Sequence, residues 1–388
     1  MLTRRGWAVT VGGVLLAVAG RLLGLLELYV LAAGCWALMA MALAFLALRR
    51  ADVDARRTLT PSRVRAGDET RVELAVTNHG RRATPVIELR DPVDGGPKRA
   101  RLLMAPLPAG TTDRAHYRIP TDGRGVVRVG PLEVRRFDSL TLAAKGAVVA
   151  PESELVVFPV FEELLPLPHA RGDDRRGGFR QATAVGASGD DFYALRPWVL
   201  GDDLRQVHWP STARRDELMV RQHDIPWQGR ATVVLDNRAR FHDDDSLEQA
   251  VSAAAGILVS SGRGDTQVRL VTTDGADSGF GSGPAHLEAL LERLARVDAG
   301  AGDLPALPHT TGAMAVVVSA DAPAADVAHL ARLGDRPGSL TIVVVAPEGT
   351  QAQAAPAGTV VRIGPGEPLA PAWNRAMAAA GAARGATR

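Results

Sequence analysis

The sequence is poor in several residue types on which common chemistries depend. Its 388 residues include one cysteine, Cys35, which excludes an intramolecular disulfide framework. Lysine occurs only at Lys98 and Lys145, and no Gly-x-x-x-x-Gly-Lys-Ser/Thr motif is present, so a P-loop nucleotide site is not expected. The 45 basic residues are nearly matched by 43 acidic ones, without a long Lys/Arg stripe. Nucleic acid is therefore not an expected partner.

Hydrophobic residues are abundant, at 46% of the chain, and they are concentrated first near the N-terminus. In the range Trp7–Leu48 only Arg21 and Glu27 interrupt the apolar residues, and these two lie close together in its middle. Residues 1–50 are therefore predicted to form a transmembrane helical hairpin. Its second arm, Leu28–Leu48, has about the ~20 residues that cross a bilayer, and its first arm reaches that length only if Arg21 snorkels to the interface.

Arginines flank both ends of this hairpin. Arg4 and Arg5 precede it, and Arg49 and Arg50 follow it. The positive-inside rule then places both termini and all soluble domains in the cytoplasm, with the chain anchored in the cytoplasmic membrane. Export is the alternative, because Thr3–Trp7 partly resembles a twin-arginine signal. The apolar region is, however, about twice as long as a cleaved signal requires.

Residues 51–162 show short alternating runs of apolar and polar residues, separated by turn sequences such as Asn78-His79-Gly80. Strands at this spacing predict an immunoglobulin-like β-sandwich domain. Residues 163–188 are rich in Pro, Gly and mixed charge and are expected to form a linker. The runs expected as strands are Arg71–Thr77, Val86–Leu89, Ala115–Ile119, Val126–Val129 and Glu154–Phe158.

Residues 226–388 alternate near-continuous apolar runs with helical periods, which predicts a doubly wound α/β domain with a buried parallel sheet. The expected strands are Ala231–Leu235, Val268–Thr272, Ala315–Ser319 and Leu340–Ala346. The expected helices contain Leu247–Leu258, Leu287–Val297, Val327–Leu333 and Pro371–Ala380.

Residues 189–225, called the signature segment below, interleave charge, aromatic rings and turn residues. Several of its positions together resemble the signature of the proteins filed as domain of unknown function 58. These are Gly189, Asp190, Arg196, Pro197, Gly201, Asp202, Asp203, Arg205, Trp209, Ala213, Arg214, Val220 and Arg221. The sequence departs from that family's usual pattern at His208, where Asp is common, and at Pro210, where Lys is common.

The residues of the signature segment also predict its structure. Its Asp and Arg side chains are expected to form a network of ion pairs. Trp198 and Trp209 are expected to be buried against the sheet of the last domain. The turn at Gly201 should begin a short helix that Pro210 stops, and a strand should follow over Glu217–His223.

The family is taken to contain a von Willebrand factor A fold, which the last domain resembles in size and strand order. Functional A-type domains place Asp-x-Ser-x-Ser after the first strand and hold Mg²⁺ there. This chain has Asp236 followed by Arg238 and Arg240 in place of the serines, and Asp321 matches the second carboxylate. We therefore expect a degenerate site that holds no metal, in which arginines pair with the carboxylates.

The resemblance implies a function as well as a fold. Similar proteins are commonly found alongside MoxR-type AAA+ ATPases, so we expect a non-enzymatic membrane-anchored adaptor without a cofactor. The expected contact residues are Arg238, Arg240, Asp274 and Asp321, at the carboxyl ends of the strands.

Two alternatives belong to other functional classes. A metal-dependent ligand-binding receptor would need the missing serine pair. A hydrolase would need a nucleophile elbow, which the trio of His208, Ser211 and Asp202 does not supply.

Overall fold

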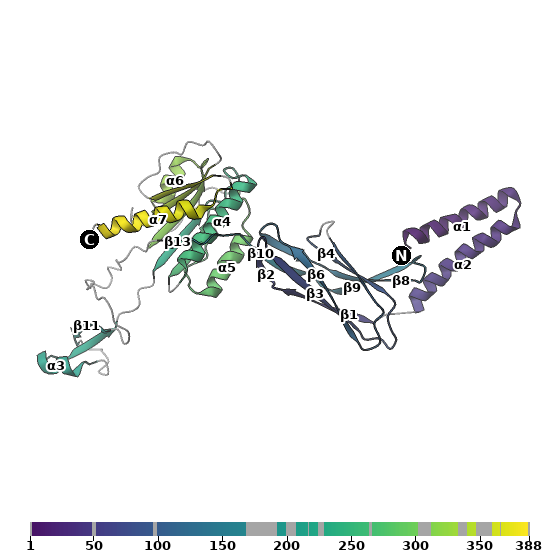
Figure 1. The fold of residues 1–388 in the computed structure, drawn as a ribbon, viewed down its shortest axis with the longest axis horizontal. Coiled ribbons are helices and arrows are strands. Elements are labelled where there is room, and N and C mark those ends of the chain that lie inside the picture. Colours follow the sequence, from purple (N-terminus) through teal and green to yellow (C-terminus); the bar gives the residue numbers. More distant parts are fainter. Residues whose placement is uncertain are drawn as a thin grey trace. The chain divides into compact units, whose positions relative to one another are not determined.

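The protein is mixed α/β, with two apolar N-terminal helices, several sheets with antiparallel pairing and one parallel sheet (Figure 1). The computed structural model describes residues 2–48, 52–95, 99–167, 192–198, 207–215, 217–223, 229–263, 266–301, 312–332, 340–346, 359–364 and 366–386. The chain divides into two compact units, one of Met1–Phe161 with Ala289–Asp298 and one of Glu162–Glu288 with Ala299–Arg388.

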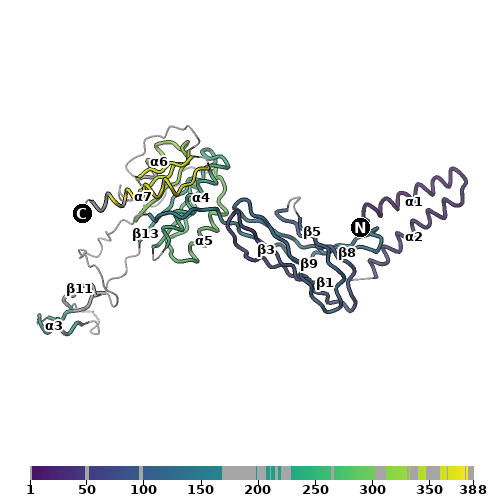
Figure 2. The backbone as a smooth tube through the Cα atoms, viewed as in Figure 1, coloured from purple at the N-terminus to yellow at the C-terminus, as the bar shows by residue number. Residues whose placement is uncertain are grey.

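The first unit begins with a helical hairpin of α1 (Arg4–Leu23) and α2 (Leu26–Leu48), which Figure 2 traces as two neighbouring purple coils. Both helices are long and apolar enough to cross a membrane, with mean hydropathies of 1.6 and 2.2. Gly6, Gly13 and Gly20 are the buried residues of α1 and recur every seventh position. A Cβ at Gly13 would lie 2.8 Å from Trp36 Nε1 of α2, so glycine allows the helices to approach closely.

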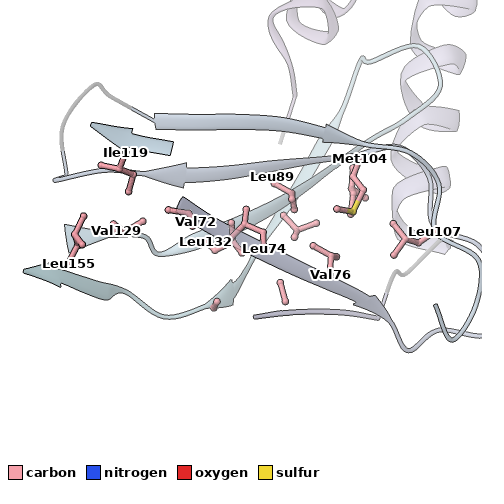
Figure 3. Packing of buried hydrophobic residues seen from close by; sticks show 14 of the residues in the cluster. Val72, Leu74, Val76, Leu89, Met104, Leu107, Ile119, Val129, Leu132 and Leu155 are labelled. Carbon is pink, nitrogen blue, oxygen red and sulfur yellow. The ribbon is translucent and has the colours of Figure 1, made fainter. Parts of the chain in front are cut away.

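The rest of this unit consists of short strands around one hydrophobic core. They form sheets of order β1-β3-β6, β2-β10-β7 and β5-β4-β8-β9. Figure 3 shows Leu74, Leu89 and Leu132 meeting inside this core, where each is at most 1% exposed. The strands are β1 (Val53–Thr60), β2 (Arg63–Arg65), β3 (Glu69–Asn78), β4 (Ile87–Pro92), β5 (Arg99–Met104), β6 (Thr112–Pro120), β7 (Gly125–Val129), β8 (Leu132–Phe137), β9 (Ala144–Ala150) and β10 (Ser153–Phe158).

Every strand expected in this region is present as β3, β4, β6, β7 or β10, and the other strands were not predicted. A buried ion pair lies among them. Arg57 donates from Nε to Asp91 at 2.9 Å, and the Tyr117 hydroxyl donates to the same carboxylate at 2.6 Å. Burial, together with Asp91, raises the pKa of Tyr117 above its ordinary value.

The second unit contains a five-stranded, wholly parallel sheet of order β14-β13-β15-β16-β17. Each helix and strand predicted for residues 226–388 has a counterpart among the described residues, where β17 is an additional strand that was not predicted. The elements are β13 (Arg230–Leu235), α4 (Asp244–Ser261), β14 (Gln267–Thr272), α5 (Pro284–Ala295), β15 (Ala313–Ser319), α6 (Ala324–Ala331), β16 (Leu340–Val345), β17 (Thr359–Ile363) and α7 (Leu369–Ala386), with α5 divided between the two units.

The chain entering the second unit is fixed to its C-terminal helix. The carboxylate of Glu162 accepts from the backbone N–H groups of Leu369 and Ala370, at 2.7 and 3.0 Å, and so caps α7. The fully buried Trp373 donates from Nε1 to Leu165 O at 2.7 Å. The beginning of the predicted linker, up to Leu167, thus lies against this domain. Residues 168–188 lie outside the described residues.

Candidate functional site at the carboxyl edge of the parallel sheet

The strand order defines one distinctive edge of the parallel sheet. The chain starts at β13, steps to β14 on one side, and then crosses to β15 on the other, so the order reverses between β13 and β15. In open α/β sheets, ligands and partners bind beyond the carboxyl ends of the strands at such a point. Asp236, Asp274 and Asp321 follow β13, β14 and β15 there.

A buried ion-pair triad occupies this edge. The guanidinium of Arg238 donates from Nε to Asp236 Oδ1 at 2.9 Å and from Nη2 to Oδ2 at 2.6 Å. Its remaining terminal nitrogen, Nη1, donates to Asp326 Oδ2 at 2.6 Å. Arg238 is 1% exposed and Asp236 is 0% exposed. Both oxygens of the first carboxylate are therefore engaged by a fixed cation that belongs to the chain itself.

The same contacts set the charge state of the triad. Burial lowers the pKa of Arg238, but its hydrogen bonds with Asp236 and Asp326 raise it by more, so the pKa lies above its ordinary value. The guanidinium thus stays protonated. Across the described residues, no three His, Cys, Asp or Glu side chains gather as a group that could hold a metal ion.

The loops around the triad are tied to each other by side-chain hydrogen bonds. Thr273 donates from Oγ1 to Asn237 Oδ1 at 2.9 Å, and Asn237 accepts the N–H of Gly300 on its carbonyl at 2.8 Å. Partial burial alone would raise the pKa of Asp274. Hydrogen bonds from Thr272, the Ala276 N–H and Asn237 lower it by a larger amount, so the pKa lies below its ordinary value. Asp274 is therefore a stable negative charge at neutral pH.

Two expectations for this edge were wrong. Arg238 was expected to contact a partner protein but is buried, because its guanidinium turns inward to Asp236. Its second carboxylate partner is Asp326, in the first turn of α6, and not Asp321. Three of the four predicted contact residues, Arg240, Asp274 and Asp321, are exposed. We call these three the acidic-basic rim.

Phe241 links the triad to the rim. Its ring lies 4.6 Å from the guanidinium carbon of Arg238 and 4.9 Å from that of Arg240. The next residue, His242, is half-buried, and burial lowers its pKa below the ordinary value. The sequence carried no signal that Phe241 or His242 belongs to this edge, apart from their closeness to Asp236 along the chain.

A cavity of about 600 Å³ lies beside α4 and the ends of β16 and β17. Its charged lining is acidic, from Glu162, Asp243, Asp245 and Glu367. Gln249, also in the lining, donates from Nε2 to Gly364 O at 2.6 Å. Glu162, Asp243 and Glu367 already accept hydrogen bonds as helix caps or loop ties, so the lining does not form a recognisable reaction centre.

The signature segment forms its own small structure. β11 (Phe192–Pro197) pairs with β12 (Met219–His223) in antiparallel fashion, and α3 (Trp209–Arg215) lies between them in the chain. The pairing sets Arg196 opposite Val220 and Pro197 opposite Met219. The described part of the signature also includes Ala213, Arg214 and Arg221. The predicted positions Gly189, Asp190, Gly201, Asp202, Asp203 and Arg205 lie outside the described residues.

Two predictions about the signature segment were wrong. Trp209 is 64% exposed, so its ring is not buried against a sheet, and the buried residues here are Val207 and Met219. Pro210 does not stop a helix but lies in the first turn of α3, where a missing N–H costs nothing. The strand predicted over Glu217–His223 is present as β12.

The two departures from the expected pattern are His208, directly before this helix, and Pro210, in its first turn. His208 donates its backbone N–H to Met219 O at 2.7 Å, and its Nδ1 lies 2.8 Å from Ser211 Oγ. Thr212 Oγ1 accepts the N–H of Met219 at 3.0 Å. His208 thus helps to fix α3 on β12. Asp202, the third member of the conceivable triad, lies outside the described residues.

The sequence of this part of the chain matches one known protein family. The model of a family described as "Protein of unknown function DUF58" matches residues 194–352. Residues 194–352 are thus similar to the DUF58 family. The matched range begins in β11 and extends past β16, so it includes both the described signature residues and the Arg238 triad.

Solved structures give only weak likenesses to this chain. The CARDB domain of a Pyrococcus furiosus protein is 15% identical, covering 28% of this chain and 93% of that chain, with a TM-score of 0.22. The Pseudomonas fluorescens alkylpurine DNA glycosylase AlkC is 11% identical over 29% and 33% of the two chains, with a TM-score of 0.20. At these scores the likenesses carry no argument. No curated protein matches the sequence.

Proposed function

We propose that this chain is a non-enzymatic, membrane-anchored adaptor that works with a MoxR-type AAA+ ATPase in assembly or envelope-related processes. The Arg238 triad is the observation that supports it best. A guanidinium with 1% exposure binds both oxygens of Asp236, where a functional A-type domain would bind Mg²⁺. A domain that closes this position with its own cation is suited to binding a protein surface.

We further propose that the second unit is a degenerate, doubly wound von Willebrand factor A-like domain and that the strands of the first unit form an immunoglobulin-like β-sandwich. The wholly parallel sheet supports the first assignment. Isolated antiparallel bridges of Asp277 and Gly281 to β14 add an antiparallel edge to that sheet. For the second assignment, the support is the shared core of the short strands.

The ATPase is proposed to contact the acidic-basic rim. Arg240, Asp274 and Asp321 are exposed and carry both signs of charge, which would set partner choice and association rate. The test is affinity purification of the full chain from its native membranes, followed by mass spectrometry. Arg240→Glu should reduce the co-purified ATPase, and Arg362→Glu, exposed on strand β17, is the matched control. Equal recovery with both variants would move the contact away from the rim.

Membrane topology is a separate part of the proposal. Arginines at both ends of the hairpin support a cytoplasmic position for everything after Arg49. A reporter that is active only outside the cytoplasm, fused after Arg388, should stay silent. Strong reporter activity would place the soluble domains on the other side of the membrane.

A metal-dependent receptor is the first competing function, and thermal unfolding in Mg²⁺ tests it. A site filled to a hundred times its dissociation constant stabilises a domain by about 2.7 kcal/mol. We expect no such shift, because the Arg238 guanidinium already binds Asp236. A shift that Asp236→Ala abolishes would favour the receptor.

A hydrolase is the second competing function, and the contact between His208 and Ser211 at 2.8 Å is the observation in its favour. A serine-reactive fluorophosphonate probe distinguishes a hydrolase from an adaptor. The adaptor proposal expects no labelling. Labelling of the full chain that Ser211→Ala removes would establish an activated serine.

A further inference from the structure

The loop Asp138–Ala143 contacts the open end of the helical hairpin. Thr3 donates its N–H to Leu142 O at 2.9 Å and its hydroxyl to Thr141 O at 2.6 Å. A Cβ at Gly6 would lie 2.0 Å from Leu142 O, so glycine is required for this approach. The loop and the hairpin therefore form one packed junction. Its buried apolar members are Met39, Ala42, Leu46, Leu142 and Ala143.

The junction lies at the level where the apolar part of α2 ends. At about 1.5 Å per residue, the 23 residues of α2 span roughly 35 Å, slightly more than the ~30 Å hydrocarbon core of a bilayer. Leu46, in the last turn of α2, packs in the same cluster as Leu142. Trp7, in the first turns of α1, is 59% exposed, as interfacial aromatic residues are. With the hairpin in a membrane, this loop would lie among the lipid headgroups.

The charge around the junction is positive. Arg4 and Arg5 are exposed at the start of α1, and Arg5 donates from Nη1 to Thr141 Oγ1 at 3.0 Å. The register of β8 and β9 sets Arg136 directly opposite Lys145, next to the loop. Lys145 is exposed and Arg136 is half-buried.

The loop itself contributes one carboxylate, Asp138, and one apolar side chain at its tip, Leu140. Asp138 is buried, and its carboxylate accepts the N–H groups of Leu140 and Ala143, at 2.9 and 2.6 Å. Its charge is thus directed into the loop and not toward the cations. Leu140 at the tip is 50% exposed. An apolar tip among cations is the arrangement by which proteins contact anionic membrane surfaces.

We propose that this junction is a binding site for the phosphate headgroups of anionic phospholipids, with Arg5, Arg136 and Lys145 as the phosphate contacts and Leu140 inserted among the acyl chains. The proposal rests on the membrane anchoring proposed above. It goes beyond anchoring because it gives the first unit a fixed orientation on the membrane and a preference for one class of lipid.

The test is native mass spectrometry of the full chain, extracted from vesicles that contain equal amounts of phosphatidylglycerol and phosphatidylethanolamine. Wild-type protein should retain phosphatidylglycerol preferentially. The charge-removing variant Arg136→Gln/Lys145→Gln should lower that preference roughly 25-fold, since each cation near an anionic surface contributes about fivefold. The matched control is Arg99→Gln/Arg101→Gln on β5, the other edge strand of the same sheet, where both residues are exposed.

Further readouts separate the outcomes. The charge-conserving variant Arg136→Lys/Lys145→Arg should restore the preference, which shows that loss in the glutamine variant is not misfolding. Equal retention of both lipids by wild type, or equal loss in the β5 control, would overturn the inference. Protease protection of α1 and α2 in the vesicles tests anchoring independently. A chain that inserts without lipid preference contradicts only this site, whereas a chain that fails to insert contradicts the anchoring proposal as well.

Discussion

Replacing Arg238 by Met tests whether the guanidinium holds the carboxyl edge of the parallel sheet together. The substitution keeps most of the side-chain volume but leaves the fully buried Asp236 without the two hydrogen bonds that it accepts from the guanidinium of Arg238. Removing one partner of a buried ion pair costs about 3 to 5 kcal/mol, because the remaining charge stays desolvated. For a domain of this size, that corresponds to a fall in melting temperature of roughly 6 to 20 °C.

The assay is thermal or urea unfolding of the full chain, with two companion variants. Arg240→Met, two residues along and exposed, should change the free energy of unfolding by no more than about 0.5 kcal/mol. Arg238→Met/Asp236→Leu should recover much of the lost stability, since replacing a whole buried pair by apolar residues is often neutral. If Arg238→Met alone melts like wild type, the triad does not stabilise this edge and the reasoning is refuted.

Other predictions follow from single contacts. Gly13→Leu should destabilise the hairpin by about 1 to 3 kcal/mol through overpacking against Trp36. Gly12→Leu should not, because a Cβ at Gly12 would have no atom within 4 Å. Unfolding in nanodiscs measures both variants. Trp209→Ala should leave the melting temperature nearly unchanged because the ring is exposed, as should the conserving control Trp209→Phe, and a marked fall with Trp209→Ala would contradict this. Burial lowers the pKa of His242, so below its ordinary pKa the unfolded chain binds a proton at this residue while the folded chain does not. Stability should therefore fall as the pH drops through about 6.5, and His242→Asn should reduce that fall in urea titrations.

The sequence predicted the parallel sheet well because its strands carry their own signal. β13 and β15 are buried on both faces and read as continuous apolar runs, while α4 shows a clear helical period. β17 was missed because Arg362 interrupts a short run. Among the antiparallel strands, the edge strands β5 and β9 were missed for a related reason, since Arg99 and Arg101 interrupt the first and Lys145 and Gly146 the second.

The candidate site was only partly predictable. The pairing of Asp236 with Arg238 could be expected from their closeness in sequence, but the inward turn of the guanidinium depends on Asp326. That residue is 88 positions away and reaches the site only because α6 starts beside the end of β15. Trp209 was misjudged because large aromatic residues are usually buried, and its helix is instead held on β12 by the backbone of His208.

The most direct measurement is the binding of a purified MoxR-type ATPase to the full chain reconstituted in nanodiscs, followed by biolayer interferometry over a salt series. The account predicts saturable binding that weakens with salt, is reduced by Arg240→Glu at the rim, and does not depend on a metal ion at Asp236, so Asp236→Asn should bind normally once it folds. No binding of the wild-type chain, or binding that Asp236→Asn abolishes in a folded protein, would contradict the adaptor function.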